Sequence, residues 1–357
     1  MLQLTCRNVP DPDGHHTHLL LQGDWIIVEI SDGRFTGRGE VSHSGNDAEC
    51  IKTVHRLFSK HIQRMDPTTR AIRKLERGPF ASTTGFVVAT AMSGLNQALY
   101  ELVAKRNSVP VWELFTDERS RELITTYATL NRALIDRAPK AYEDAVRLAL
   151  GQGFRAVKCA PFERVMRHGN QLEQSRQGLS VLKFLRKRFP DLSIRVDFHE
   201  RFQLATFLRI LPELEPLFLH WLEAPLPVGE DYHELRAVCN TTIALGELRF
   251  GTEGFRDIVE QRWADVVMPD VKHVGGVGPL IHLARSYEGE IEVSPHNPSG
   301  PIASLASAHV CAAHHSVGAL ELPLITDPGR AYYMDWLSDG FLNLPSGSGW
   351  GNGAGIA

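Results

Sequence analysis

Apolar and polar positions follow one pattern before residue 123 and a different one after it. From there to about residue 323, short apolar runs alternate with stretches whose apolar residues recur at helical spacing. Strands that alternate with helices predict repeated βα units around a parallel sheet, and eight such units favour a closed barrel. The candidate strands are TTYATLN, FRAVKCA, IRVDF, LFLHWLE, TIALGE, DVVMPD, IEVSPH and VGALELP, and the last has no clear helix after it.

Residues 1–122 show strands first and helices afterwards. LLLQG and WIIVEISDGRFTGRGEV predict strands, with a hairpin turn at Asp32-Gly33. Helical patterns follow from Asp47 to about Arg77, and residues 86–106 have apolar positions at helical spacing. Strands followed by helices predict an α+β module. No low-complexity linker separates this module from the βα units, so we expect the two parts to share an interface.

Composition narrows the class of protein without identifying it. The 357 residues are 43% apolar and 22% charged, which is typical of a soluble globular protein. The net charge of -4 gives no basic surface for nucleic acid, and no apolar stretch reaches the length of a membrane span. The N-terminus lacks the layout of a signal peptide, so we expect a cytoplasmic protein.

Five scattered cysteines without a CxxC pair argue against disulfides and structural zinc. The Gly/Ser-rich tail, SGSGWGNGAG, is predicted to lie outside the core.

Acidic residues and one histidine recur at the ends of the apolar runs, at intervals of roughly 25 residues, about the length of one βα unit. They are Asp197, Glu223, Glu247, Asp270, His296 and Glu321. In a closed barrel the strand ends meet at one rim, and that rim is where the chemistry takes place. Carboxylates crowded together repel one another unless protons or a cation intervene. The pattern therefore predicts a metal site.

Three of these carboxylates suit a hard cation. Asp197, Glu223 and Glu247 end three successive runs, and oxygen ligands with room for water and substrate are typical of Mg²⁺. No cysteine or histidine is among the three, which argues against zinc.

The next two run ends predict an acid–base pair. A carboxylate at Asp270 beside the imidazole of His296 would fix its tautomer and raise its basicity, which makes a general base. Lys158 ends the second run and could be a base, a charge clamp or a Schiff-base nucleophile. His199 lies two residues beyond Asp197 and therefore points to the same face if the strand continues. His220, His233, His282, His309, His314 and His315 are expected to be structural.

The ordered set of motifs resembles the enolase superfamily, mandelate racemase subgroup, over nearly the whole chain. The motifs are SGLNQALYELVAKRNSVPVWELF, VKCA, VDFH, WLEAPLP, LGE, MPDVKHVGG, SPHNPSGP and LELP. The resemblance implies an α/β protein in which an α+β capping domain covers a modified (β/α)7β barrel of the TIM type. The capping domain would span residues 1–122 and be completed by residues 328–357, and the barrel would span residues 123–327. We also expect a homo-oligomer, because related barrels often assemble.

The same resemblance implies chemistry. One Mg²⁺ per chain would be held by Asp197, Glu223 and Glu247, and a proton next to a substrate carboxylate would be removed to give an enediolate. Lys158 and a protonated Glu321 would stabilise the charge that develops. Substrate contacts are expected from the loop at 11–18, from the loop at 42–47, which contains His43 and Asn46, and from Asn131.

One position departs from the family pattern. The racemase motif is Lys-x-Lys, whereas this chain has Lys158-Cys159-Ala160, so one face of the substrate lacks its usual base. VDFH with PDVKHVGG looks instead like sugar-acid dehydratases such as galactonate dehydratase. The resemblance then implies that His296 removes the C2 proton of an aldonate or related acid sugar, and that His199 protonates the departing 3-hydroxyl.

Three alternatives stay open on the sequence alone. The first is a racemase or epimerase of an α-hydroxy acid that uses His296 and an unidentified partner. The second is a Schiff-base aldolase that uses Lys158. The third is a catalytically silent barrel that binds an acid sugar.

Overall fold

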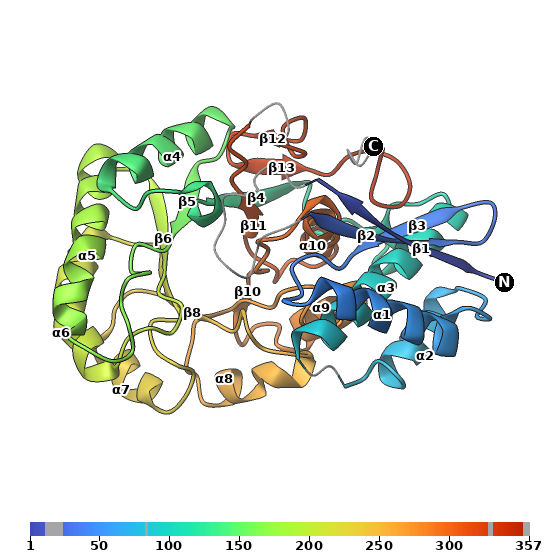
Figure 1. The fold of residues 1–357 in the computed structure, drawn as a ribbon, viewed down its shortest axis with the longest axis horizontal. Coiled ribbons are helices and arrows are strands. Elements are labelled where there is room, and N and C mark those ends of the chain that lie inside the picture. Colours follow the sequence, from blue (N-terminus) through green and yellow to red (C-terminus); the bar gives the residue numbers. More distant parts are fainter. Residues whose placement is uncertain (11–23, 83–84, 328–330, 353–357) are drawn as a thin grey trace.

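The computed structural model describes residues 1–10, 24–82, 85–327 and 331–352 (Figure 1). The predicted strand LLLQG and the candidate substrate loop at 11–18 lie outside the described residues. Among the helices that are described, none is both long and apolar enough to cross a lipid bilayer.

A three-stranded antiparallel sheet forms the N-terminal part. Its strands are β1 (Gln3–Val9), β2 (Trp25–Ser31) and β3 (Thr36–Glu40), in the order β1-β2-β3. The hairpin predicted at Asp32-Gly33 is confirmed: Asp32 Oδ1 accepts hydrogen bonds of 2.8 Å from the backbone N–H groups of Arg34 and Phe35. The carboxylate therefore holds the turn closed.

Three helices follow this sheet in the chain. They are α1 (Asp47–Leu57), which continues into a π-helical turn (Phe58–Ile62), α2 (Thr69–Arg77) and α3 (Phe86–Arg106). Helix α3 packs against the sheet, and α1 and α2 pack against α3. The helix predicted at 86–106 is confirmed. It lies directly on β3 because Gly37 and Gly39 have no side chain: a Cβ on Gly39 would come within 1.9 Å of the Gly94 carbonyl oxygen.

Eight parallel strands form the barrel. They are β4 (Leu123–Thr129), β5 (Ala156–Cys159), β6 (Ser193–Asp197), β7 (Trp221–Glu223), β8 (Ile243–Leu245), β9 (Val266–Val267), β10 (Glu292–Val293) and β11 (Leu320–Pro323). Neighbours pair in chain order, β11 pairs with β4, and a parallel bridge between Val293 and Val317 closes the ring. The predicted barrel is confirmed.

Seven helices lie between the strands, on the outside of the ring (Figure 1). They are α4 (Pro139–Gly151), α5 (Gln171–Arg188), α6 (Leu204–Leu214), α7 (Asp231–Val238), α8 (Arg256–Glu260), α9 (Val277–Ser286) and α10 (Pro301–Ala313). Within the described residues no helix follows β11, which gives the (β/α)7β order expected from the sequence.

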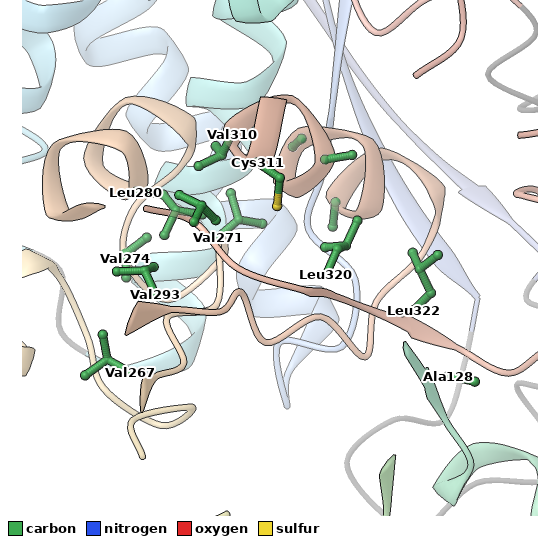
Figure 2. Close-up of a cluster of buried hydrophobic side chains, with 14 of the residues drawn as sticks. Ala128, Val267, Val271, Val274, Leu280, Val293, Val310, Cys311, Leu320 and Leu322 are labelled. Atoms are coloured by element: carbon green, nitrogen blue, oxygen red, sulfur yellow. The ribbon is translucent and has the colours of Figure 1, made fainter. Parts of the chain in front are cut away.

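The apolar faces of the last helices bury the sheet from outside. Leu280 of α9 and Val310 and Cys311 of α10 gather with Val293 of β10 and Leu320 of β11 (Figure 2). All five side chains are fully buried. Apolar burial of this kind, worth about 25 cal/mol per Å², is the main force that holds each helix against its strands.

The C-terminal segment corrects one expectation. Its hairpin, β12 (Leu337–Ser338) and β13 (Phe341–Asn343), pairs with β4 of the barrel. Trp350, in the Gly/Ser-rich tail that was predicted to lie outside the core, is fully buried, and its indole N–H donates to the Arg38 carbonyl oxygen at 2.9 Å. The prediction was wrong because one large aromatic ring among glycines can still fill a cavity. The domain limits at 122 and 327 stay a prediction.

A buried carboxylate joins the two parts of the molecule. Glu40 at the end of β3 accepts hydrogen bonds from the backbone N–H groups of Gly300, Ile302 and Ala303 at 2.8–3.0 Å. These groups form the first turn of α10, where N–H groups have no partner within the helix. Glu40 therefore caps a barrel helix from the N-terminal sheet.

Candidate active site

The predicted functional residues lie at one rim of the barrel because they end, or directly follow, successive parallel strands. Lys158 is in β5, and Asp197 and Glu223 are paired neighbours at the ends of β6 and β7. Asp270 and His296 follow β9 and β10 and face each other across a parallel bridge. Glu247 follows β8, and Glu321 is in β11. All of them are buried.

Lys158 holds two of the carboxylates together. Its Nζ lies 2.9 Å from Glu223 Oε1, 3.0 Å from the Glu321 carboxylate and 3.9 Å from Asp197 Oδ2. Burial alone would lower the pKa of Lys158, but Glu223 and Glu321 raise it well above its usual value. Lys158 is therefore a fixed ammonium that compensates negative charge.

The structure brings two of the three expected metal ligands, Asp197 and Glu247, together with His199 rather than with Glu223. Oxygens of Asp197 and Glu247 and a ring nitrogen of His199 lie within 4.8 Å of one another. The oxygens of Glu223 are engaged by Lys158 and by the Trp221 indole N–H, at 2.9 and 3.1 Å. Burial raises the pKa of Glu223 to about 8, and the like charges of Asp197 and Glu247 add to that rise against the opposing effect of Lys158. A cation would relieve this repulsion, so the residues fit a hard divalent ion.

His296 lies between two carboxylates. Its Nδ1 is 3.0 Å from Asp270 Oδ2, and its Nε2 is 3.1 Å from Glu247 Oε2. Burial lowers the pKa of His296, but the charges of Glu247 and Glu321 and the hydrogen bonds to Asp270 and Glu247 raise it to about 10. The expected pair of Asp270 and His296 is thus formed, with the second ring nitrogen turned toward the carboxylate cluster.

His199 also lies between two carboxylates. Its Nε2 is 2.9 Å from Asp197 Oδ2, and its Nδ1 is 2.5 Å from Glu163 Oε1. Burial opposes the charged form, but Asp197 and Glu163 raise the pKa of His199 well above its usual value. The two carboxylates therefore favour the charged form of His199.

A cavity of about 460 Å³ joins these groups. Lys158, Asp197, His199, Glu247, Asp270, His296 and Glu321 line it, together with His43 and Asn131. Asn46 is not among the lining residues: its side chain accepts a hydrogen bond from the Glu49 N–H and caps α1. Asn131 Oδ1 accepts from the N–H of Ala160, at the position where the racemase pattern has its second lysine.

Sequence reasoning missed several lining residues. Glu163 and Arg201 form an ion pair of 2.6 Å beside His199, and Lys272 lies next to Asp270. Phe86, at the start of α3, closes part of the cavity from the N-terminal side. Arg201 and Lys272 each come two residues after a predicted site residue, but β6 ends at Asp197 and β9 at Val267, so no strand period points to them. Glu163 is in a loop, so no strand period points to it either.

A comparison with protein families matches residues 140–353 to the family described as enolase C-terminal domain-like. That is more than half of the chain. The chain belongs to this family. The comparisons place it in the mandelate racemase subgroup of the enolase superfamily, in agreement with the resemblance of its motifs.

Relatives in this superfamily include two sugar-acid dehydratases. The chain is 26% identical to D-xylonate dehydratase of Haloferax volcanii, over 88% of this chain and 77% of the relative. It is 27% identical to D-galactonate dehydratase of Cronobacter sakazakii, over 80% of this chain and 75% of the relative. A crystal structure of a mandelate racemase/muconate lactonizing enzyme-like protein from Rubrobacter xylanophilus has a TM-score of 0.82 and 25% identity, and covers 98% of this chain and 93% of its own.

Proposed function

We propose that this enolase-superfamily member dehydrates a sugar acid, an aldonate or a related compound, to a 2-keto-3-deoxy acid with the help of Mg²⁺. The observation that carries the proposal is the pair of imidazoles, His296 and His199, each of which contacts one of two clustered carboxylates, Glu247 and Asp197. Dehydration needs a base for the C2 proton and an acid for the C3 hydroxyl, and the two histidines can fill these roles. The names of the dehydratase relatives support the same reaction class.

His296 is the proposed base. Asp270 accepts from Nδ1 and Glu247 faces Nε2, so His296 carries both ring protons while Glu247 is charged. A cation on Glu247 would offset that charge and favour the neutral imidazole, whose Nε2 can then take the C2 proton. The tautomer follows from the hydrogen bond, because an ionised carboxylate can only accept.

Lys158 and Glu321 are proposed to stabilise the charge that develops on the substrate carboxylate. Mg²⁺ bound by Asp197, Glu223 and Glu247 would supply Lewis-acid stabilisation of the same charge. Lys158 is held at a fixed position by its two carboxylates and needs no rearrangement, which is the condition for efficient electrostatic catalysis. The Glu321 carboxylate accepts from Lys158 and from the Asn297 N–H at 3.2 Å, so its expected protonated form stays a prediction.

His199 is the proposed acid. Its proton passes to the C3 hydroxyl, the C3–O bond breaks, and water leaves. The electron pair left at C2 forms the C2–C3 double bond of an enol, which becomes the 2-keto-3-deoxy acid when C3 is protonated. No oxidant or reductant is required.

Two of the alternatives are less well supported. Lys158 is a clamped ammonium, whereas an aldolase needs a neutral amine to form a Schiff base. Ala160 offers no group that can carry a proton on the face where a racemase has its second lysine. The silent barrel remains a matter for experiment.

The test is a screen of mono- and diacid sugars with Mg²⁺, in which keto-acid formation is measured with semicarbazide. We expect one stereochemical series to react, and EDTA to abolish the reaction. His199→Asn should retain exchange of the C2 proton in D₂O and lose elimination, since the base is untouched. Loss of both activities would contradict a separate acid, and turnover in EDTA would contradict the metal requirement.

A homo-oligomer and a cytoplasmic location are also part of the proposal. Light scattering of the purified protein measures the first, and fractionation of cells that express the chain measures the second.

A further inference from the structure

Lys272 is a buried ammonium on the cavity wall that none of the proposed steps uses. It comes two residues after Asp270, its side chain is 3% exposed, and it lines the same cavity as His296. A lysine this deeply buried is unusual unless an anion or several acceptors surround its charge.

The described residues give this ammonium no hydrogen bond. The carboxylate atom nearest to its Nζ is Asp270 Oδ2, at 3.9 Å, which is beyond hydrogen-bond distance. Both oxygens of Asp270 are already engaged: Oδ2 by His296 Nδ1, and Oδ1 by the backbone N–H of Lys272 itself at 2.8 Å. Lys158 on the same wall provides the contrast, since it has acceptors at 2.9 and 3.0 Å.

The position of Lys272 relative to the metal-ligand carboxylates indicates which part of a ligand it would meet. Glu247, His296 and Asp270 follow one another by contacts of 3.1 and 3.0 Å, and Lys272 lies beyond Asp270 in this series. Among these contacts, Lys272 is thus linked to Glu247 through Asp270 and His296 and does not touch it directly. His43 and Gly45 of the N-terminal part line the same cavity. Burial raises the pKa of Glu40, at the end of β3, and Lys272 is close enough for its charge to oppose that rise. Lys272 therefore lies near the N-terminal sheet.

We propose that Lys272 binds the second carboxylate of a sugar diacid. The first carboxylate of the diacid would face Asp197, Glu223 and Glu247 through Mg²⁺, as in the proposed function, on which this inference rests. A carboxylate is favoured over a hydroxyl because a charge-assisted hydrogen bond is the stronger one, and Lys272 has no acceptor within hydrogen-bond distance among the described residues. The substrate class is then an aldaric acid, and Lys272 determines specificity for its far end.

The experiment separates binding from turnover. In a His296→Asn background, which cannot complete the reaction, thermal shift and calorimetry with Mg²⁺ compare five- and six-carbon aldarates with the matching aldonates. Lys272→Met removes the charge and keeps the length of the side chain, and Lys272→Arg keeps the charge. Lys183→Met is the control, because Lys183 is half-exposed on α5 and pairs with Glu213.

We expect an aldarate to bind the background protein more tightly than its aldonate. Loss of one partner of a buried charge pair weakens binding by about 30-fold or more. Lys272→Met should weaken binding of the aldarate by that factor and binding of the aldonate by less than about threefold. Lys272→Arg should restore part of the affinity for the aldarate. Lys183→Met should change neither.

Several results would overturn the inference. Equal losses for aldarate and aldonate would show that Lys272 does not distinguish the second carboxylate, as would binding of no aldarate at all. A fall in kcat with unchanged KM and a displaced pH profile, measured with His296 restored, would show that Lys272 acts only on Asp270. If Lys272→Met loses only aldarate binding and the wild type forms no keto acid, the role of Lys272 in binding is supported. The same result contradicts the dehydratase proposal.

Discussion

The barrel rim and the interface between the N-terminal part and the barrel both bury charged groups, but they satisfy them in different ways. At the rim, side chains pair with side chains: Lys158 with Glu223 and Glu321, and His296 with Glu247 and Asp270. At the interface, Glu40 pairs with three backbone N–H groups of α10. Backbone donors cannot move without the helix, whereas the ends of side chains can exchange partners when a ligand binds.

This difference predicts where substitutions act. The carboxylates at the rim repel one another, so removal of one of them reduces the repulsion among the rest. We therefore expect such a substitution to reduce activity more than it reduces the free energy of unfolding. At Glu40 the charged neighbour that acts on the carboxylate, Lys272, has the opposite sign, and removal of this carboxylate leaves N–H groups without a partner. We therefore expect rim variants to fold and fail in catalysis, and interface variants to unfold more easily.

The largest effect is expected for His296→Asn. Removal of a general base reduces the rate by about 10²–10⁴-fold, and exchange of the C2 proton in D₂O should disappear together with turnover. Asn can still donate to Asp270, so the melting temperature should change little. Full exchange in this variant would assign the base to another residue.

Glu40→Ala should cause the largest loss of stability among these variants. Three N–H groups of α10 lose their acceptor, and we expect a loss of about 3 kcal/mol in the free energy of unfolding, measured with urea. Glu40→Gln keeps one acceptor oxygen and should lose less. Unchanged stability of Glu40→Ala would remove the distinction between interface and rim.

Gly39→Ala tests the contact between β3 and α3. The new Cβ would lie 1.9 Å from the Gly94 carbonyl oxygen, so the helix must move outward, at a cost of about 2 kcal/mol. Gly151→Ala, at the end of α4, meets nothing within 4 Å and is the matched control. Equal stability of the two variants, measured in urea, would contradict the close approach.

The smallest effect is expected for His309 of α10, as a dependence of stability on pH that is measured over the single unit from pH 6.5 to 5.5. Burial lowers its pKa to about 3, while its Nδ1 accepts from the Trp112 N–H at 3.2 Å. The unfolded chain binds a proton below about pH 6.5 and the folded chain does not, so stability falls as the pH falls from about 6.5 toward 3, by up to about 1.4 kcal/mol per pH unit. His309→Gln should flatten this slope between pH 6.5 and 5.5, measured with urea, and an unchanged slope would assign it to other groups.

Local patterns were sufficient for most of the fold. Residues 86–106 form a helix within the predicted limits, because apolar positions at helical spacing must face one core. The rim residues were also predictable, since parallel strands of similar length end on the same side of a barrel. Trp350 was not, because its burial depends on contacts with β3 and α3, far away in the chain.

The sequence by itself determined the order of strands and helices and the side of the barrel on which Asp197, Glu223, Glu247 and His296 lie, because both follow from periodicity along the chain. Only the tertiary structure decided which of these groups touch, that Glu163 holds His199, and that Lys272 has no acceptor within hydrogen-bond distance in the part of the chain that is described. Contacts of this kind depend on distances across the barrel of a few ångströms, and no spacing along the chain encodes them.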